Sequence, residues 1–154
     1  MIEPATLNDA PAIHRISESA GVFSQREIAS VGEMLDAFFN PTPDDDHIFL
    51  IHRAPAVVGF ACYGPTPFTD RVWEVYWICV ERKHQRNHVG HELMEHIKST
   101  LRAQSARALY LETSDSDAYQ AARVFYEHEG FENVAHLADF YAAGEGKKTF
   151  RYLF

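Results

Sequence analysis

Apolar positions along this chain change between a helical and an extended rhythm, which predicts helices interleaved with strands. Spacings of three and four predict helices from a Thr6–Asp9 cap to about Gly21, over 25–39, over 89–104, and around Ala118, Ala122, Phe125 and Tyr126. Short apolar runs predict strands at 1–4, 48–51, 56–63, 72–80, 108–112, 131–141 and 148–154, the last two joined around residues 144–146. This order predicts a mixed α/β (α+β) sheet with helices on both faces.

The strand expected at 72–80 is apolar on both sides, as is usual for a central strand that is covered twice. Strict alternation puts one set of residues on one face, Trp73, Val75, Trp77 and Cys79, and the other set opposite, Tyr76, Ile78 and Val80. Glu74 is the one charged residue inside this strand, and alternation places it on the face of Tyr76 and Ile78.

A basic segment joins this strand to the following helix. Between residues 81 and 91 the only acid is Glu81, against three cations and three histidines: Arg82, Lys83, Arg86, His84, His88 and His91. The first N–H groups of a helix have no partner within it, and the aligned peptide dipoles add positive charge there. The segment therefore predicts an anion site in which a phosphate contacts the main chain.

The spacing of Gln85, His88 and Gly90 resembles the acyl-CoA pyrophosphate loop of the GNAT superfamily of N-acetyltransferases, which has Gln or Arg, two residues, Gly, one residue, then Gly or Ala. Phe125-Tyr126 and Gly130-Phe131 resemble a second element of that family. The resemblance extends along 1–154 as a single domain. It implies the GNAT fold, with a mixed sheet of six to seven strands, about four helices and a splay between strands 4 and 5.

The resemblance also implies acetyl-CoA as the co-substrate and a primary amine of a small molecule or peptide as the acceptor. Pyrophosphate contacts are implied for Gln85, Arg86, Asn87, His88, Val89, Gly90 and His91. Contacts with the pantetheine arm are implied for Ile78, Cys79, Val80 and Tyr119. His88 and Arg86 stand where the family has glycines, which allow positive φ. A second hypothesis is therefore a non-catalytic acyl-CoA-binding or regulatory module.

Acyl transfer to an amine requires a base for the amine and a proton for the leaving thiolate. The resemblance assigns the acid role to Tyr126, whereas helical spacing alone is also typical of a core aromatic. Glu74 is the candidate base, with solvated carboxylate as the alternative reading and Glu112 as a second candidate. Five aromatic residues are expected either to line the acceptor site or simply to pack in the core: Phe23, Phe38, Phe39, Phe140 and Tyr141. Asp70 or Asp139 is expected to face the ammonium group of the acceptor.

The nine histidines raise the question of a metal site. His91 and His96 are five residues apart, so they point about 140° from one another around a helix and do not form the His-Glu-x-x-His motif. His88, His91 and Glu95 could share a face, but such spacings arise by chance on exposed helices. No metal is expected.

With 22 acidic and 14 basic residues the net charge is -8, which disfavours nucleic acid and slightly favours cationic acceptors. No apolar run reaches the roughly 18 residues of a membrane span, and Met1-Ile-Glu-Pro4 is unlike a signal peptide, so a cytoplasmic location is expected. Cys62 and Cys79 are expected to be buried thiols. Homodimers are common among similar proteins, so a homodimer is one expected form.

Overall fold

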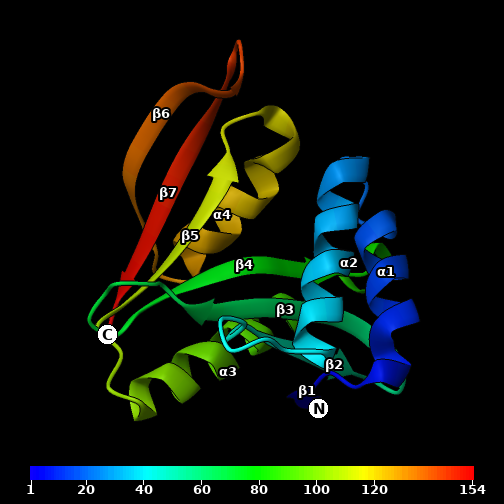
Figure 1. Ribbon diagram of the computed structural model, residues 1–154. Coiled ribbons are helices and arrows are strands. Elements are labelled where there is room, and N and C mark those ends of the chain that lie inside the picture. The colour runs from blue at the N-terminus through cyan, green and yellow to red at the C-terminus, as the bar shows by residue number, and fades with distance from the viewer.

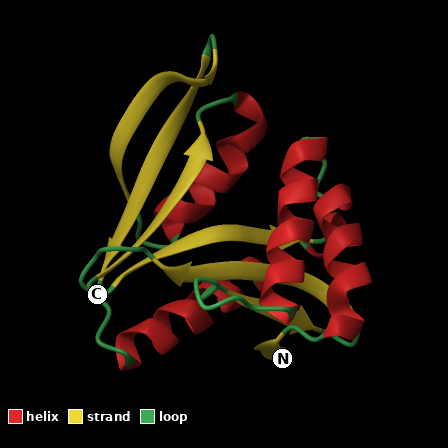
Figure 2. Ribbon diagram, in the orientation of Figure 1, coloured by secondary structure: helices red, strands yellow, loops and turns green.

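The computed structural model describes residues 1–154 as a seven-stranded mixed sheet with four α-helices (Figures 1 and 2). The strand order is β1-β2-β3-β4-β5-β7-β6. The strands are β1 (Ile2–Pro4), β2 (Ile48–Arg53), β3 (Val57–Pro65), β4 (Val72–Val80), β5 (Ala108–Ser114), β6 (Glu132–Ala142) and β7 (Glu145–Leu153). The helices are α1 (Ala10–Ser19), α2 (Gln25–Phe39), α3 (Val89–Ala103) and α4 (Gln120–His128). The predicted fold class is confirmed, and no helix is both long and apolar enough to cross a membrane.

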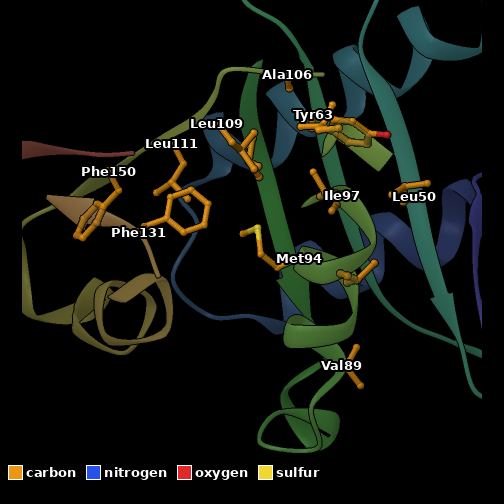
Figure 3. Packing of buried hydrophobic residues seen from close by; sticks show 14 of the residues in the cluster. Leu50, Tyr63, Val89, Met94, Ile97, Ala106, Leu109, Leu111, Phe131 and Phe150 are labelled. Atoms are coloured by element: carbon orange, nitrogen blue, oxygen red, sulfur yellow. The ribbon is translucent and has the colours of Figure 1, made fainter. Parts of the chain in front are cut away.

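Two apolar clusters attach the helices to opposite faces of the sheet. One buries α1 and α2 residues such as Ile13 and Leu35 against Phe60 of β3. The other contains Met94 and Ile97 of α3 together with Leu109 of β5, and Figure 3 shows these side chains in the same cluster. The free Cys62 and Cys79 thiols are buried, as predicted.

A β-bulge at Tyr76 corrects the predicted faces of β4. Cys62 of β3 pairs with Trp77 and the next residue, Tyr63, pairs with Val75, so Tyr76 is an extra residue in β4. Because of the extra residue, the side chains after the bulge lie on the faces opposite to those that strict alternation predicts. Trp73 and Val75 pack on the α3 side together with Ile78 and Val80, whereas Tyr76, Trp77 and Cys79 pack on the α1–α2 side. Glu74 therefore shares a face with Tyr76 but not with Ile78.

The strands β4 and β5 pair only at their beginnings. Their parallel register runs from Val72 with Ala108 to Val75 with Leu111 and then stops. Beyond that point β4 continues to Val80 beside β3, and β5 continues to Ser114 beside β7. Figure 1 shows β4 and β5 separating, which confirms the splay expected between strands 4 and 5. The edge of β4 away from β3 has no strand partner over Tyr76–Val80.

Several predicted boundaries were wrong by one to a few residues; β2, for example, extends to Arg53 and β3 to Pro65. The strand β5 extends to Ser114, and β7 begins at Glu145 because the turn uses Gly144, whose φ is 81°. Ala118 is exposed in a 3₁₀ turn before α4 instead of facing inward on the helix. The Thr6–Asp9 cap is present, with Thr6 N and Oγ1 donating to Asp9 Oδ2 at 2.9 and 2.7 Å, but it opens a 3₁₀ turn that precedes α1.

Gly146 lies where β5, β6 and β7 come closest, and it yields a prediction about stability. A Cβ atom there would be 2.8 Å from the carbonyl oxygen of Leu137 and 2.5 Å from Asp115 Oδ2. We expect Gly146→Ala to lower the free energy of unfolding by about 1–3 kcal/mol, since backbone cannot move aside as a side chain can. Gly90→Ala is the control, because its Cβ would meet side chains alone, the Phe125 ring at 3.4 Å and Val80 Cγ2 at 3.7 Å. Equal denaturation midpoints for the two variants would contradict the account.

Candidate active site

The loop between β4 and α3 has left-handed backbone at both positions where glycine was expected. Arg86 has a φ of 63°, and His88, the N-cap of α3, has a φ of 61°. Non-glycine residues rarely adopt this region, which costs on the order of 1–3 kcal/mol when they do. The loop therefore keeps a glycine-type shape with other residues in it.

The charges of this loop leave two arginines available to an anion. The buried Glu81 forms ion pairs with Arg15 and, at 3.4 Å each, with Lys83 and His84. Arg82 and Arg86 are exposed and form no ion pair within the chain. The predicted anion site thus keeps positive charge beside the first turn of α3, where His88 provides no side-chain cap to the N–H groups.

Other loop residues brace the start of α3. Gln85 Nε2 donates to the carbonyl oxygen of Val80 at 3.2 Å, which closes the loop on the end of β4. His91 Nδ1 lies 2.8 Å from Glu129 Oε1, just after α4. Gly90 lets the Phe125 ring approach to 3.4 Å of a Cβ position, so α4 packs directly on the first turn of α3. Asn87 is exposed and Val89 is buried.

The positive φ of His88 leads to a second prediction. The left-handed conformation of His88 is part of the folded backbone, so its cost lowers the stability of the folded protein. We expect His88→Gly to raise the free energy of unfolding by about 1 kcal/mol. Asn87→Gly is the control, because Asn87 does not have positive φ, and glycine should lower stability there. Urea denaturation compares the variants, and a less stable His88→Gly protein would contradict the strain.

Tyr126 lies on α4 among aromatic side chains, with its ring 5.8 Å from that of Phe150 and 6.3 Å from that of Phe131. Its hydroxyl forms no hydrogen bond within the chain. Burial, followed by the nearby Cys79 thiol of β4, raises the pKa of Tyr126 above its ordinary value of 10.0. The phenol is therefore protonated at neutral pH and is free to donate where β4 and β5 separate.

Glu74 is half-buried on β4, just before the strands separate, and has no hydrogen-bond or ion-pair partner in the chain. Burial and then the charge of Glu112 raise its pKa, while Lys147 opposes the shift. The second candidate base, Glu112, is exposed and accepts from Lys147 Nζ at 2.8 Å. Of the two carboxylates, Glu74 is the one without a cation bonded to it.

The hydroxyl of Tyr119 contacts α2 in this conformation. It lies 3.0 Å from Glu27 Oε1 and 3.2 Å from the carbonyl oxygen of Val22. These contacts join the start of α4 to the start of α2 across the end of β4. The contact with a pantetheine arm stays a prediction for Tyr119, as the main-chain contacts do for Ile78, Cys79 and Val80.

The expected acceptor aromatics divide into core and surface. Phe38 packs against Phe49 at 5.8 Å in the core. Phe39 packs on Phe38 at 5.2 Å, and Phe23 packs edge-on against Trp77 at 5.4 Å. Phe140 and Tyr141 are exposed near the tip of the β6–β7 hairpin.

The two expected acidic partners have other contacts. Asp70 pairs with Arg71 at 3.1 Å and with Arg107 at 3.6 Å. Asp139 accepts from Gly144 N at 2.6 Å. The structure instead brings Glu27 and Glu145 toward Tyr119, and no local pattern around either residue indicates this role.

A group with metal-ligand chemistry lies behind the loop. His91, Glu95 and Glu129 offer ligand atoms within 4.8 Å of one another. Lys98 Nζ is 2.9 Å from Glu95 and 3.0 Å from Glu129, so its ammonium already neutralises the carboxylates. A bound cation would be repelled by this lysine.

Comparison with known proteins identifies the family. The acetyltransferase (GNAT) domain model matches residues 44–133, which include β4, the loop and Tyr126. The chain belongs to the GNAT family of acetyltransferases. A solved structure of a Desulfovibrio desulfuricans protein assigned to the GNAT acetyltransferases is 31% identical, with a TM-score of 0.92 over 99% of this chain and 98% of that one. No curated protein matches significantly.

More distant GNAT structures share the fold alone. An aminoglycoside 6'-N-acetyltransferase complexed with coenzyme A is 16% identical, with a TM-score of 0.76 over 99% of this chain and 96% of that one. A ribosomal-protein-alanine N-acetyltransferase from Brucella melitensis is 18% identical, with a TM-score of 0.76 over 100% of this chain and 99% of that one. Their different acceptors show that this fold does not determine the acceptor.

Proposed function

We propose that this GNAT protein is an acetyl-CoA-dependent N-acetyltransferase that transfers the acetyl group directly to a primary amine of a small molecule or peptide. The observation that carries the proposal is the separation of β4 and β5 after Val75 and Leu111. It leaves main-chain groups of β4 after Val75 without a strand partner on that edge, with Glu74 just before them and Tyr126 near Cys79. The cofactor and the acceptor amine would thus meet at the gap between β4 and β5.

The chain's residues fit acetyl-CoA on two counts. The uncapped start of α3, with Arg82 and Arg86 exposed beside it, suits a pyrophosphate. The unpartnered edge of β4 from Ile78 to Val80 suits the amides of a pantetheine arm, which would extend the sheet by hydrogen bonding. Acetyl-CoA supplies an activated acetyl thioester. No metal has a role in the proposal.

The protein would contribute one proton acceptor and one proton donor. Glu74, directly or through water, takes a proton from the acceptor ammonium so that the nitrogen can attack the thioester carbonyl. The new C–N bond forms as the C–S bond breaks, and the phenol of Tyr126 gives its proton to the leaving thiolate. The attacking nitrogen loses its second proton in the same step, and this proton, carried by water, restores the Tyr126 phenol. The raised pKa values of both groups suit these roles, because a stronger base accepts the proton and the phenol stays protonated.

The alternative is a non-catalytic acyl-CoA-binding or regulatory module, suggested by Arg86 and His88 in place of glycines. The positive φ at both residues supports retained binding, which either function requires. Catalysis requires Tyr126 and Glu74 as well. The cytoplasmic location and the homodimer expected from the sequence stay predictions.

Calorimetric titration of acetyl-CoA into the purified protein tests the binding half of the proposal. Micromolar affinity is expected for acetyl-CoA, with dephospho-CoA as the control for contacts beyond the pyrophosphate and pantetheine. Absence of binding at millimolar acetyl-CoA would overturn both the enzyme and the binding module.

A further inference from the structure

Carboxylates from four elements lie beside the separating strands, one pair close to each other and three of them around Tyr141. They are Glu27 of α2, Glu74 of β4, Glu112 of β5 and Glu145 of β7. Only Glu112 has a cation, Lys147 at 2.8 Å. Glu27 bonds the Tyr119 hydroxyl at 3.0 Å, Glu145 accepts from Ser114 Oγ at 2.6 Å, and Glu74 has no partner. The other three carboxylates therefore form no ion pair within the chain, although Lys147 also lowers the pKa of Glu74.

Tyr141 of β6 lies among three of these carboxylates. Burial, then the charges of Glu112, Glu27 and Glu145, raises its pKa above the ordinary value of 10.0. The side chain remains 49% exposed, so a ligand can reach this place from solvent. Tyr141 thus marks the point where α2, β5 and β7 present negative charge together.

A large bulge in β6 places Phe140 and Tyr141 at this point. Leu137 pairs with Lys147 and Ala142 pairs with Glu145, so residues 138–141 of β6 face only Gly146 of β7. Bulges re-aim side chains, and they are common beside active sites. Phe140, next to Tyr141 in the bulge, already holds a cation on its ring, with Lys147 Nζ 4.1 Å from the ring centroid.

The charges at the two ends of the reaction path are opposite. Arg82 and Arg86 face the cofactor end, while the carboxylates surround the acceptor end. One carboxylate, Glu74, is enough for the single ammonium group that reacts. Glu112 repels Glu74, and the one cation that forms an ion pair in this group is Lys147. A second positive charge from the acceptor would therefore be attracted here.

We infer that the acceptor is a small diamine or polyamine, whose second ammonium group binds between Glu27, Glu112 and Glu145 against the ring of Tyr141 while its terminal amine is acetylated. The inference rests on the proposed function, because an acetyltransferase must bring an amine to the separating strands. Charge-assisted hydrogen bonds and the aromatic face hold the second ammonium, and its distance from the reacting nitrogen selects the acceptor.

Initial rates with acetyl-CoA and a matched amine series test the inference. Each linear diamine is compared with the alkylamine of the same length, at low and high salt. We expect kcat/KM to be at least about tenfold higher for the preferred diamine, as for one charged hydrogen bond. The difference should shrink with salt, which screens exposed charges. Equal kcat/KM values for the two amines would overturn the inference and leave the acetyltransferase standing.

Variants locate the second ammonium. Glu145→Gln should raise KM for the diamine about tenfold and leave the KM of the alkylamine unchanged, and Glu112→Gln should raise the KM of the diamine more than that of the alkylamine. The control is Glu132→Gln, at the other end of the same hairpin, whose carboxylate is exposed and pairs only with Arg151 at 3.4 Å. An unchanged diamine KM in the Glu145 and Glu112 variants would overturn the assignment, as would a basic peptide as the preferred acceptor.

A binding measurement keeps the inference separate from catalysis. A linear triamine titrated calorimetrically into the protein with CoA should bind, and the double variant Glu112→Gln/Glu145→Gln should lose that binding. Binding without any acetylation would contradict the proposed function alone, whereas acetylation of simple alkylamines without triamine binding would contradict the inference alone.

Discussion

Tyr126→Phe is expected to lower kcat about 10²-fold, since a positioned general acid contributes at least that much. The phenol is the only proton donor in the proposed step, and its raised pKa keeps it protonated through neutral pH. Release of CoA thiol measures the rate. The affinity for acetyl-CoA and the melting temperature should not change, because the hydroxyl forms no hydrogen bond within the chain.

The matched control is Tyr152→Phe, which removes a hydroxyl that accepts from Arg102 at 3.1 Å on the far side of the sheet from Glu74. That variant should keep its rate. An undiminished rate for Tyr126→Phe with every amine tested would mean that Tyr126 is only a packed aromatic, and the acid role would fail.

Glu74→Gln is expected to lower kcat/KM about 10²-fold at neutral pH through loss of the base. Only the deprotonated carboxylate accepts a proton, so wild-type activity should rise as the pH passes through the pKa of Glu74. Burial and the charge of Glu112 raise that pKa, so the acidic limb of the pH–activity profile should have its midpoint above 4.5, the ordinary pKa of a glutamate side chain. The variant should lack the limb, and Lys147→Met should move it to higher pH because Lys147 lowers this pKa.

Stability separates this role from a folding defect. A raised pKa means that the folded protein binds the proton more tightly than the unfolded chain. Glu74 therefore costs stability as the pH rises from the unfolded pKa through the folded one, and Glu74→Gln should melt at a higher temperature at neutral pH. A variant that keeps both the rate and the acidic limb would show that Glu74 is only a solvated carboxylate.

The order of elements was predictable because each helix and strand carries its own periodicity. The loop after β4 was predictable from local chemistry, and its left-handed residues occupy the positions where the sequence lacks glycine. The faces of β4 were not predictable, because the bulge at Tyr76 depends on its pairing with β3 and leaves no mark in an alternating apolar run.

The position of Glu27 and Glu145 near Tyr141 could not be predicted from local sequence patterns either. Glu27 and Glu145 belong to elements at opposite ends of the chain, and each has an ordinary surface pattern around it. They meet near Tyr119 and Tyr141 only after the sheet has formed. Asp139 attracted attention through its neighbours Phe140 and Tyr141, but its carboxylate is used to shape the hairpin turn.

Direct, amine-dependent acetyl transfer is tested by following CoA thiol release together with the masses of the amine and the intact protein. We expect thiol release only when an amine is present, one acetylated amine for each thiol, and no mass change of the protein. An acetylated protein formed before any amine is added, for example on Cys79, would contradict direct transfer. Tight acetyl-CoA binding without release for any amine would contradict the enzyme.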